Sequence, residues 1–255
     1  MPDQFIASTY ADGVATITLD RPPQNFMNIE MMEQFNSALL AMRDHHELKV
    51  LVIRGNGDAF CGGVDLADHT RDKVARMLQM FHRIFETMRL VDVIAIAAVD
   101  GPALGGGFEL AIGCNLVLAS ESAVFALPQI KMGLFPPLAA VVLPRAGLRR
   151  KAMEWILTGD EISSSELQQF GIVNRVFPDA AFDDHLAQFV ARLTAKSGPV
   201  LQLAKRAQLE SYYATYEEGL YKVENSYLRD LMSLEDSQEG IEAARKGREP
   251  KWRNA

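Results

Sequence analysis

Hydrophobic and polar residues alternate at the start of the chain, which is the pattern of β-strands. The alternation runs from Phe5 to Tyr10 and again from Val14 to Leu19. Between the two runs, Ala11-Asp12-Gly13 supplies residue types that favour a tight turn. The pattern therefore predicts a β-hairpin.

After the hairpin the apolar residues recur every three or four positions, as in an amphipathic helix. Asn28 stands just before this stretch and is a residue type that caps helices. The apolar positions of the predicted helix are Ile29, Met32, Phe35, Leu39 and Met42. An apolar run from Leu48 to Ile53 follows, as expected for a strand buried on both faces, so the sequence predicts a β-α-β unit.

Strands and helices continue to alternate until about residue 177, and only helical patterns follow. The earlier part contains a helical stretch from Thr70 to Leu90 and apolar runs from Val93 to Val99 and Cys114 to Ala119. The later helical stretches are Ala180 to Ala195, Pro199 to Leu231 and Ser237 to Lys246. We therefore predict an α/β core over residues 1–195 and a C-terminal helical region over residues 196–255.

Charge and composition narrow the class of partner. The chain has 26 basic and 33 acidic side chains among 255 residues, and 48% of its residues are hydrophobic, which is typical of a globular protein. A pI near 5.3 argues against nucleic acid, which is normally bound by a basic surface. The most apolar region, Val91 to Ser120, is interrupted by Asp100, Glu109 and three glycines, so we expect no transmembrane helix.

The cysteines and histidines indicate neither a disulfide framework nor a metal centre. Cys61 and Cys114 could form one bridge at most, and no signal-peptide pattern follows Met1, so we expect a reduced, cytoplasmic protein. The five histidines show no metal-ligand spacing with these cysteines, and we therefore expect no metal site.

Two glycine-rich segments follow the predicted buried strands and are the candidate chemistry of the chain. In the first, Asp58 to Leu66, adjacent glycines allow a sharp turn and bring backbone N–H groups close to a ligand, although a simple tight loop would also explain them. In the second, Leu104 to Leu110, three glycines precede helix-forming residues, so free N–H groups at a helix start could stabilise developing negative charge. Glu109 lies three residues after Gly106, on the same helix face. A carboxylate beside such N–H groups can move a proton at the carbon next to a carbonyl.

The sequences AFCGGVDL at 59–66 and AAVDGPALGGGFEL at 97–110 together resemble the crotonase, or enoyl-CoA hydratase/isomerase, superfamily. The resemblance extends from the N-terminal hairpin, with its LDRP turn, to EGIEAARKGREPKW at 239–252, and so covers nearly the whole chain. It implies a spiral of β-β-α turns with a C-terminal helical trimerisation region. It also implies a homotrimer, or a homohexamer made of two trimers, acting on acyl-CoA thioesters. No further cofactor is expected, because coenzyme A is part of the substrate.

The resemblance also implies roles for particular residues. The N–H groups of Val64 and Gly106 would hold the thioester oxygen as it becomes an enolate, with Glu109 as the acid/base. The residues implied in substrate binding are Ala59, Cys61 and Leu66 at the adenine end, Gly63 and Asp65 in the same stretch, and Gly105 beside the pantetheine. Arg21, and Lys246 or Arg248 of a neighbouring subunit, are candidates for the phosphates, with solvated surface charge as the alternative reading.

Gln129 is the main departure from the family pattern. It stands where the straight-chain hydratases have a second glutamate, and an amide cannot take up or release a proton at neutral pH. Pro137 occupies the position of the key acidic residue of the related dehalogenases and dienoyl-CoA isomerases, so neither activity is expected.

Three interpretations remain open. In the first, Glu109 hydrates an enoyl-CoA or dienoyl-CoA and Gln129 orients the water. In the second, Glu109 moves one proton between two carbons and isomerises a double bond, and in the third the protein binds acyl-CoA without catalysis. Retention of a carboxylate beside the implied oxyanion site argues against the third. The segment Ile130 to Arg145 resembles the branch that hydrates cyclic dienoyl-CoA intermediates of anaerobic aromatic breakdown.

Overall fold

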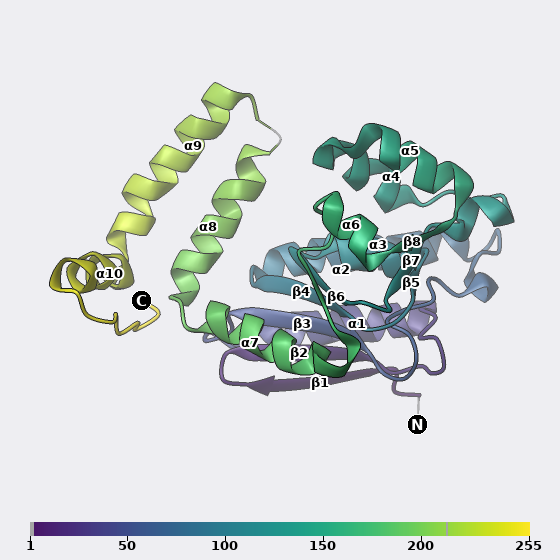
Figure 1. Ribbon diagram of the computed structural model, residues 1–255, viewed down its shortest axis with the longest axis horizontal. Helices are drawn as coiled ribbons and strands as arrows, with labels where there is room; N and C mark the ends of the chain where they lie inside the picture. Colours follow the sequence, from purple (N-terminus) through teal and green to yellow (C-terminus); the bar gives the residue numbers. More distant parts are fainter. Residues whose placement is uncertain (1–2, 213) are drawn as a thin grey trace.

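A six-stranded sheet lies at the centre of the protein (Figure 1), as seen in a computed structural model that describes residues 3–212 and 214–255. Its strand order is β1-β2-β3-β4-β6-β9. The strands are β1 (Ile6–Ala11), β2 (Val14–Leu19), β3 (Val50–Gly55), β4 (Ile94–Val99), β6 (Leu116–Ser120) and β9 (Arg175–Phe177). β1 and β2 form the predicted antiparallel hairpin, and the other neighbours pair in parallel. The α/β class is thereby confirmed.

β3 is buried on both faces, as its apolar run predicts. Val50 and Val52 pack in one hydrophobic cluster with Phe182, whereas Leu51 and Ile53 belong to the cluster on the opposite face. Because successive side chains of a strand point to opposite faces, a strand covered on both sides needs an apolar residue at every position.

Helices cover the two faces of the sheet (Figure 1). α1 (Ile29–Ala41) packs against α2 (Val74–Val91) on one side, and α7 (Phe182–Thr194) covers the other. Asn28 caps α1 as predicted, because its Oδ1 accepts a hydrogen bond from the N–H of Met31 at 2.9 Å. The helix predicted from Thr70 begins at Val74 instead, after a 3₁₀ turn and a short coil.

A second layer of short elements follows β4 and carries much of the candidate site. Three short strands, β5 (Ala103–Leu104), β7 (Val124–Ala126) and β8 (Glu161–Ser163), form a small sheet. Around it lie α3 (Gly106–Gly113), α4 (Pro137–Leu143), α5 (Arg149–Thr158) and α6 (Ser164–Gln169). Only α3 was anticipated individually from the sequence.

The last three helices project from the core as an arm (Figure 1). They are α8 (Gly198–Ser211), α9 (Tyr216–Arg229) and α10 (Glu235–Lys246). The single helical stretch predicted from Pro199 to Leu231 is therefore wrong in one respect, because two helices occupy it. Thr215 and Glu218 form a capping box that starts α9 afresh. Residue 213 lies outside the described residues, and the boundary between residues 195 and 196 stays a prediction.

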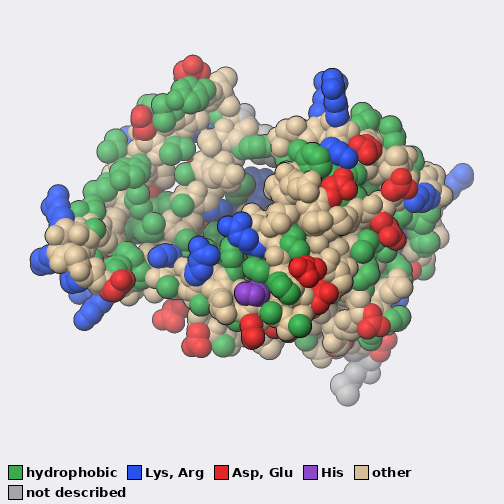
Figure 2. All heavy atoms as spheres, in the orientation of Figure 1, with side chains coloured by type: hydrophobic (Ala, Val, Ile, Leu, Met, Phe, Trp, Pro, Cys, Tyr) green, Lys and Arg blue, Asp and Glu red, His purple; other side chains and the backbone are tan. Residues whose placement is uncertain are grey.

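The arm carries large apolar side chains on its surface (Figure 2). Tyr216, Tyr221 and Leu228 on α9 are 79%, 68% and 69% exposed. The C-terminal tail turns back to the base of the arm, where the indole N–H of Trp252 donates to the carbonyl of Ala195 at 2.8 Å. Within residues 3–212 and 214–255, no helix has both the length and the apolar content to cross a membrane.

Candidate active site

The two glycine-rich segments lie side by side at the carboxyl ends of adjacent parallel strands. The first follows β3 and the second follows β4. An isolated parallel bridge joins them: Cys61 N–H donates to Pro102 O at 3.1 Å, and Leu104 N–H donates to Cys61 O at 2.9 Å. Ligands of α/β proteins commonly bind at this edge of the sheet, where the strands end.

Val64 and Gly106, the two residues predicted to donate N–H groups, are brought together by this arrangement. A Cβ built on Gly106 would lie 3.3 Å from the nitrogen of Val64. Gly63 has a φ of +110°, and a Cβ there would come within 2.9 Å of the carbonyl oxygen of Leu104, so this turn requires glycine. In the described ranges, neither the N–H of Val64 nor that of Gly106 has a hydrogen-bond acceptor in the protein. Two N–H groups, that of Val64 in the loop and that of Gly106 at the start of α3, therefore remain available close to each other.

Glu109 lies one turn into α3 and is 3% exposed. Its Oε1 accepts hydrogen bonds from the N–H groups of Leu138 at 2.7 Å and Ala139 at 3.0 Å, both in the first turn of α4. Burial raises the pKa of Glu109 from 4.5 to about 7, and these two N–H groups oppose the rise. A carboxyl group with this pKa can accept and release a proton near neutral pH.

The raised pKa of Glu109 makes the stability of the fold depend on pH. Because the pKa of Glu109 is raised in the folded state, ionisation opposes folding, and the cost grows between pH 4.5 and about 7. Glu109→Gln removes the titration, so the variant should gain stability relative to wild type as pH rises, by up to about 3 kcal/mol. Urea unfolding of both proteins at pH 5 and pH 8 measures this difference. If the free energies of unfolding of the variant and wild type differ by the same amount at pH 5 and pH 8, Glu109 titrates with its ordinary pKa.

Gln129 faces Glu109 across the site. It lies in the 3₁₀ turn Pro128–Met132, is 9% exposed, and donates from Nε2 to Oε2 of Glu109 at 3.3 Å. Its Oε1 is the one buried side-chain oxygen or nitrogen in the described part of the chain without a hydrogen-bond partner. Since buried polar atoms are rarely left unpaired, this oxygen is suited to receive a hydrogen bond from a bound molecule.

These groups line a largely apolar cavity of about 250 Å³. Gly63, Val64, Gly105, Gly106, Glu109 and Gln129 all contribute to its wall. The apolar part of the wall comes chiefly from α2 and from the turn before α4, and includes Val74, Met77, Leu78, Phe81, Leu134 and Phe135. The cavity therefore suits an apolar acyl group whose polar end meets the two N–H groups and the carboxyl group.

The remaining predicted substrate-binding residues are not all at this cavity. Leu66 lines it and is 57% exposed, whereas Ala59 and Cys61 are buried outside its wall. The carbonyl of Ala59 accepts from Asn25 Nδ2 at 2.8 Å, so this oxygen already has a partner within the protein. The assignment of Ala59 and Cys61 to substrate binding stays a prediction.

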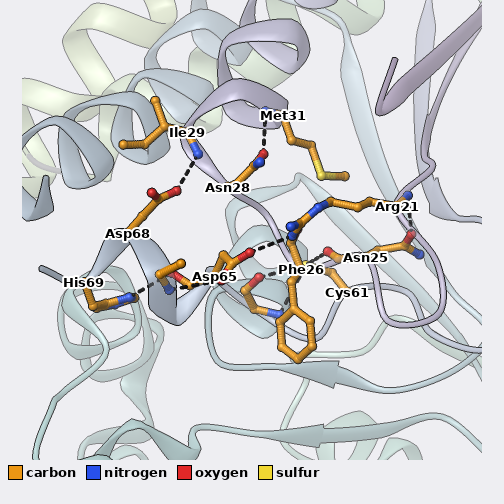
Figure 3. Close-up of polar contacts among 12 residues, drawn as sticks. Arg21, Asn25, Phe26, Asn28, Ile29, Met31, Cys61, Asp65, Asp68 and His69 are labelled. Atoms are coloured by element: carbon orange, nitrogen blue, oxygen red, sulfur yellow. Dashed lines mark hydrogen bonds and ion pairs between the residues drawn. The ribbon is translucent and has the colours of Figure 1, made fainter. Parts of the chain in front are cut away.

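The basic residues considered for phosphate binding have partners within the chain. Arg21 forms an ion pair with Asp65 at 2.8 Å (Figure 3). On the arm, Lys246 pairs with Glu242, and Arg248 pairs with Glu239 at 2.6 Å. Their role with phosphates stays a prediction as well.

Sequence reasoning missed His69, which also lines the cavity. Its Nδ1 lies 3.2 Å from the carbonyl oxygen of Asp65 (Figure 3). Only the position of His69 four residues beyond Asp65, on a turn leaving the first glycine segment, could have pointed to it. The partners of Glu109 were missed too, although Pro136-Pro137 is a recognisable helix-start signal.

Residues 9–255 match a family model described as enoyl-CoA hydratase/isomerase. The chain is 31% identical to human enoyl-CoA hydratase domain-containing protein 3, mitochondrial, over 94% of this chain and 81% of that protein. It is 32% identical to 2,3-dehydroadipyl-CoA hydratase of Escherichia coli, over 94% and 95% of the two chains. A crystal structure of an enoyl-CoA hydratase from Bacillus anthracis superposes with a TM-score of 0.93 at 27% identity, covering 99% and 100% of the chains.

Proposed function

The chain belongs to the enoyl-CoA hydratase/isomerase family, and we propose that it adds water to the double bond of an enoyl-CoA or cyclic dienoyl-CoA thioester. The observation that carries this proposal is the pair of acceptor atoms in the cavity wall. Glu109 Oε2 and the unpaired Oε1 of Gln129 belong to side chains in direct contact. A water molecule can donate one hydrogen to each, which turns its lone pairs towards a bound substrate.

The thioester is placed by the backbone. Its carbonyl oxygen accepts hydrogen bonds from the N–H groups of Val64 and Gly106, and the start of α3 favours the negative charge that develops on that oxygen. These N–H groups are already held close together, so little reorganisation accompanies the reaction. The β-carbon of the substrate then lies towards Glu109 and the water.

One carboxylate accounts for all the proton transfers. Ionised Glu109 takes a proton from the water as its oxygen attacks the β-carbon, which breaks the carbon–carbon π bond and leaves an enolate. Protonated Glu109 then returns that proton to the α-carbon, the carbonyl reforms and Glu109 is ionised again. A carboxyl group of pKa about 7 suits both steps. Gln129 takes no proton and acts by orienting the water.

A second candidate is double-bond isomerisation in the same cavity. Gln129 has no acid or base form, and the wall beyond it is apolar, which favours proton transfer between two carbons without water. A third possibility, acyl-CoA binding without catalysis, leaves the buried carboxyl group of Glu109 without a purpose.

Mass analysis after incubation with a panel of linear and cyclic enoyl-CoAs separates the three. Hydration gives a product heavier by one water. Isomerisation in deuterated water gives deuterium exchange at carbon without that gain, and a binder gives neither. Gain of water on no member of the panel would refute the proposed function.

We further propose that the protein is a cytoplasmic homotrimer or a homohexamer of two trimers. The exposed apolar side chains of α9 support an assembly, because an isolated chain would leave them in water. Light scattering coupled to size-exclusion chromatography measures the number of subunits.

Replacing Gln129 by glutamate tests the one-carboxylate mechanism. For wild type, we expect kcat/KM to fall below about pH 7, because Glu109 must be ionised to accept a proton from water. In Gln129→Glu, two carboxyl groups in contact repel, which raises one pKa and should add an upper limb to the pH profile. Activity on crotonyl-CoA should rise by on the order of 10-fold or more, towards the range typical of an added acid/base.

Gln168→Glu serves as the matched control, since it adds the same charge on an exposed part of α6. The measurement is kcat/KM on crotonyl-CoA from about pH 5 to 9, a range that spans tuned carboxyl groups. If Gln129→Glu and wild type give identical profiles, Gln129 has no part in the reaction.

A further inference from the structure

Asn25, labelled in Figure 3, is a fully buried asparagine that lies outside the cavity wall. Its Nδ2 donates to the carbonyl oxygens of Asn56 at 2.9 Å and Ala59 at 2.8 Å, and lies 3.4 Å from that of Phe60. Its own φ is +52°, in the left-handed region. One side chain therefore binds the part of the loop that precedes Val64 at several points.

The residues next to Asn25 bind the rest of the same loop. Gln24 O accepts from Gly62 N–H at 2.6 Å. Met27 N–H donates to Gly63 O at 2.8 Å, and Met27 O accepts from Asp65 N–H at 2.9 Å. Residues 24–27, here called the clamp segment, thus bind the loop on both sides of Val64.

The thiol of Cys61 connects the clamp segment to the loop once more (Figure 3). Its Sγ lies 3.2 Å from Asn25 O and 3.4 Å from Gly63 N. Cys61 is completely buried, and burial raises the pKa of its thiol to about 12, so it remains a neutral thiol. The sulfur therefore acts here through packing and weak hydrogen bonds.

These contacts determine the direction of one N–H group. In a parallel bridge the flanking residues make the hydrogen bonds, so the pairing of Gly63 and Asp65 with Met27 leaves the N–H of Val64 pointing away from the clamp segment. That direction is towards Gly106 and the cavity. A shift of the clamp segment would turn the peptide plane between Gly63 and Val64.

We propose that Asn25 is a positioning residue for the reaction, and that it acts through the clamp segment to aim the N–H of Val64 at the thioester oxygen. The inference rests on the oxyanion role of Val64 in the proposed function. Displacing an oxyanion donor weakens binding of the developing charge more than binding of the substrate. The effect therefore falls on kcat, with little change in KM.

Asn25→Gly is the variant of choice, because glycine accepts the positive φ and only the side-chain hydrogen bonds are lost. We expect kcat to fall on the order of 10-fold, less than the 10²- to 10³-fold caused by losing a donor outright, with KM unchanged within a few-fold. The matched control is Asn174→Gly. It removes the hydrogen bond that the N–H of Val117, near the start of β6, donates to Asn174 Oδ1. It should lower Tm and leave kcat unchanged.

A spectroscopic probe separates positioning from stability. Binding of 2,4-hexadienoyl-CoA in a Glu109→Gln background, where turnover is blocked, should shift the dienoyl absorbance to longer wavelength, because hydrogen bonds polarise the carbonyl. Adding Asn25→Gly should reduce that shift. The proposal is overturned if folded Asn25→Gly has the kcat of wild type and if adding it to Glu109→Gln leaves the absorbance shift unchanged.

Cys61 provides a second test if Asn25→Gly does not fold. Cys61→Ala should reduce the shift, and Cys61→Ser, which keeps a donor, should restore part of it. An unchanged shift in Cys61→Ala would refute the proposal.

The proposed function and the positioning role are distinguished by two measurements, hydration by wild type and the absorbance shift in Glu109→Gln. If Glu109→Gln polarises the probe but the wild-type protein hydrates no substrate, hydration is contradicted and the positioning role stays intact, whereas no shift in Glu109→Gln would contradict both.

Discussion

Replacing Glu109 with glutamine is expected to lower kcat by about 10²- to 10⁴-fold, the typical contribution of a general acid/base. Glutamine keeps the shape of the side chain, and its Oε1 can still accept hydrogen bonds from Leu138 and Ala139. Its amide, however, cannot take up or release a proton near neutral pH. Binding of the CoA thioester should therefore stay within a few-fold of wild type, because the cavity and the two backbone donors are unchanged.

The measurement is single-turnover hydration of a substrate found in the enoyl-CoA panel, together with direct titration of its binding. Glu166→Gln is the matched control, since Glu166 lies on α6 outside the cavity wall and pairs with Lys151. Its kcat should equal that of wild type. Full activity in Glu109→Gln would assign the proton transfer to another group and refute the mechanism.

The local parts of the site could be predicted from the sequence. Three consecutive glycines after a buried strand place a helix start at Gly106, and the spacing of three residues then puts Glu109 one turn along. Both inferences depend only on neighbouring residues, which is why they agree with the structure. The hairpin and the doubly buried β3 agree for the same reason.

The long-range parts could not be predicted from local patterns. The hydrogen bonds that Glu109 accepts come from residues 20, 29 and 30 positions later in the chain, and its raised pKa follows from burial by several separate elements. Asn25 reaches carbonyls more than 30 positions away. Periodicity gives no information on such contacts, because they arise only when the layers pack.

The arm shows a different limit. The hydrophobic pattern from Pro199 to Leu231 is that of a single helical stretch. The break between α8 and α9 depends on the capping residues Thr215 and Glu218. A capping box inside a helical pattern competes with helix continuation, and its effect depends on how the neighbouring helices pack. In the folded chain the two helices lie side by side and antiparallel, so the chain must turn there.

The second prediction with a large expected effect concerns the backbone of Gly106. Gly106→Pro deletes one of the two available N–H groups, and proline is tolerated at the first position of a helix, which Gly106 occupies. We expect kcat to fall by about 10²- to 10³-fold, as for the loss of one oxyanion donor.

Proline also adds a side chain where there was none, and this effect must be separated from the loss of the N–H. A Cβ on Gly106 would lie 2.8 Å from Cγ2 of Val64, a contact that requires the valine side chain to move. Gly106→Ala introduces the same Cβ and keeps the N–H, so the ratio of kcat between the alanine and proline variants removes the effect of the Cβ and leaves that of replacing the N–H by the proline ring. Circular dichroism establishes that both fold. Equal kcat in two folded variants would mean that the thioester oxygen is not held at this helix start, whereas a large ratio assigns the charge stabilisation to the N–H of Gly106.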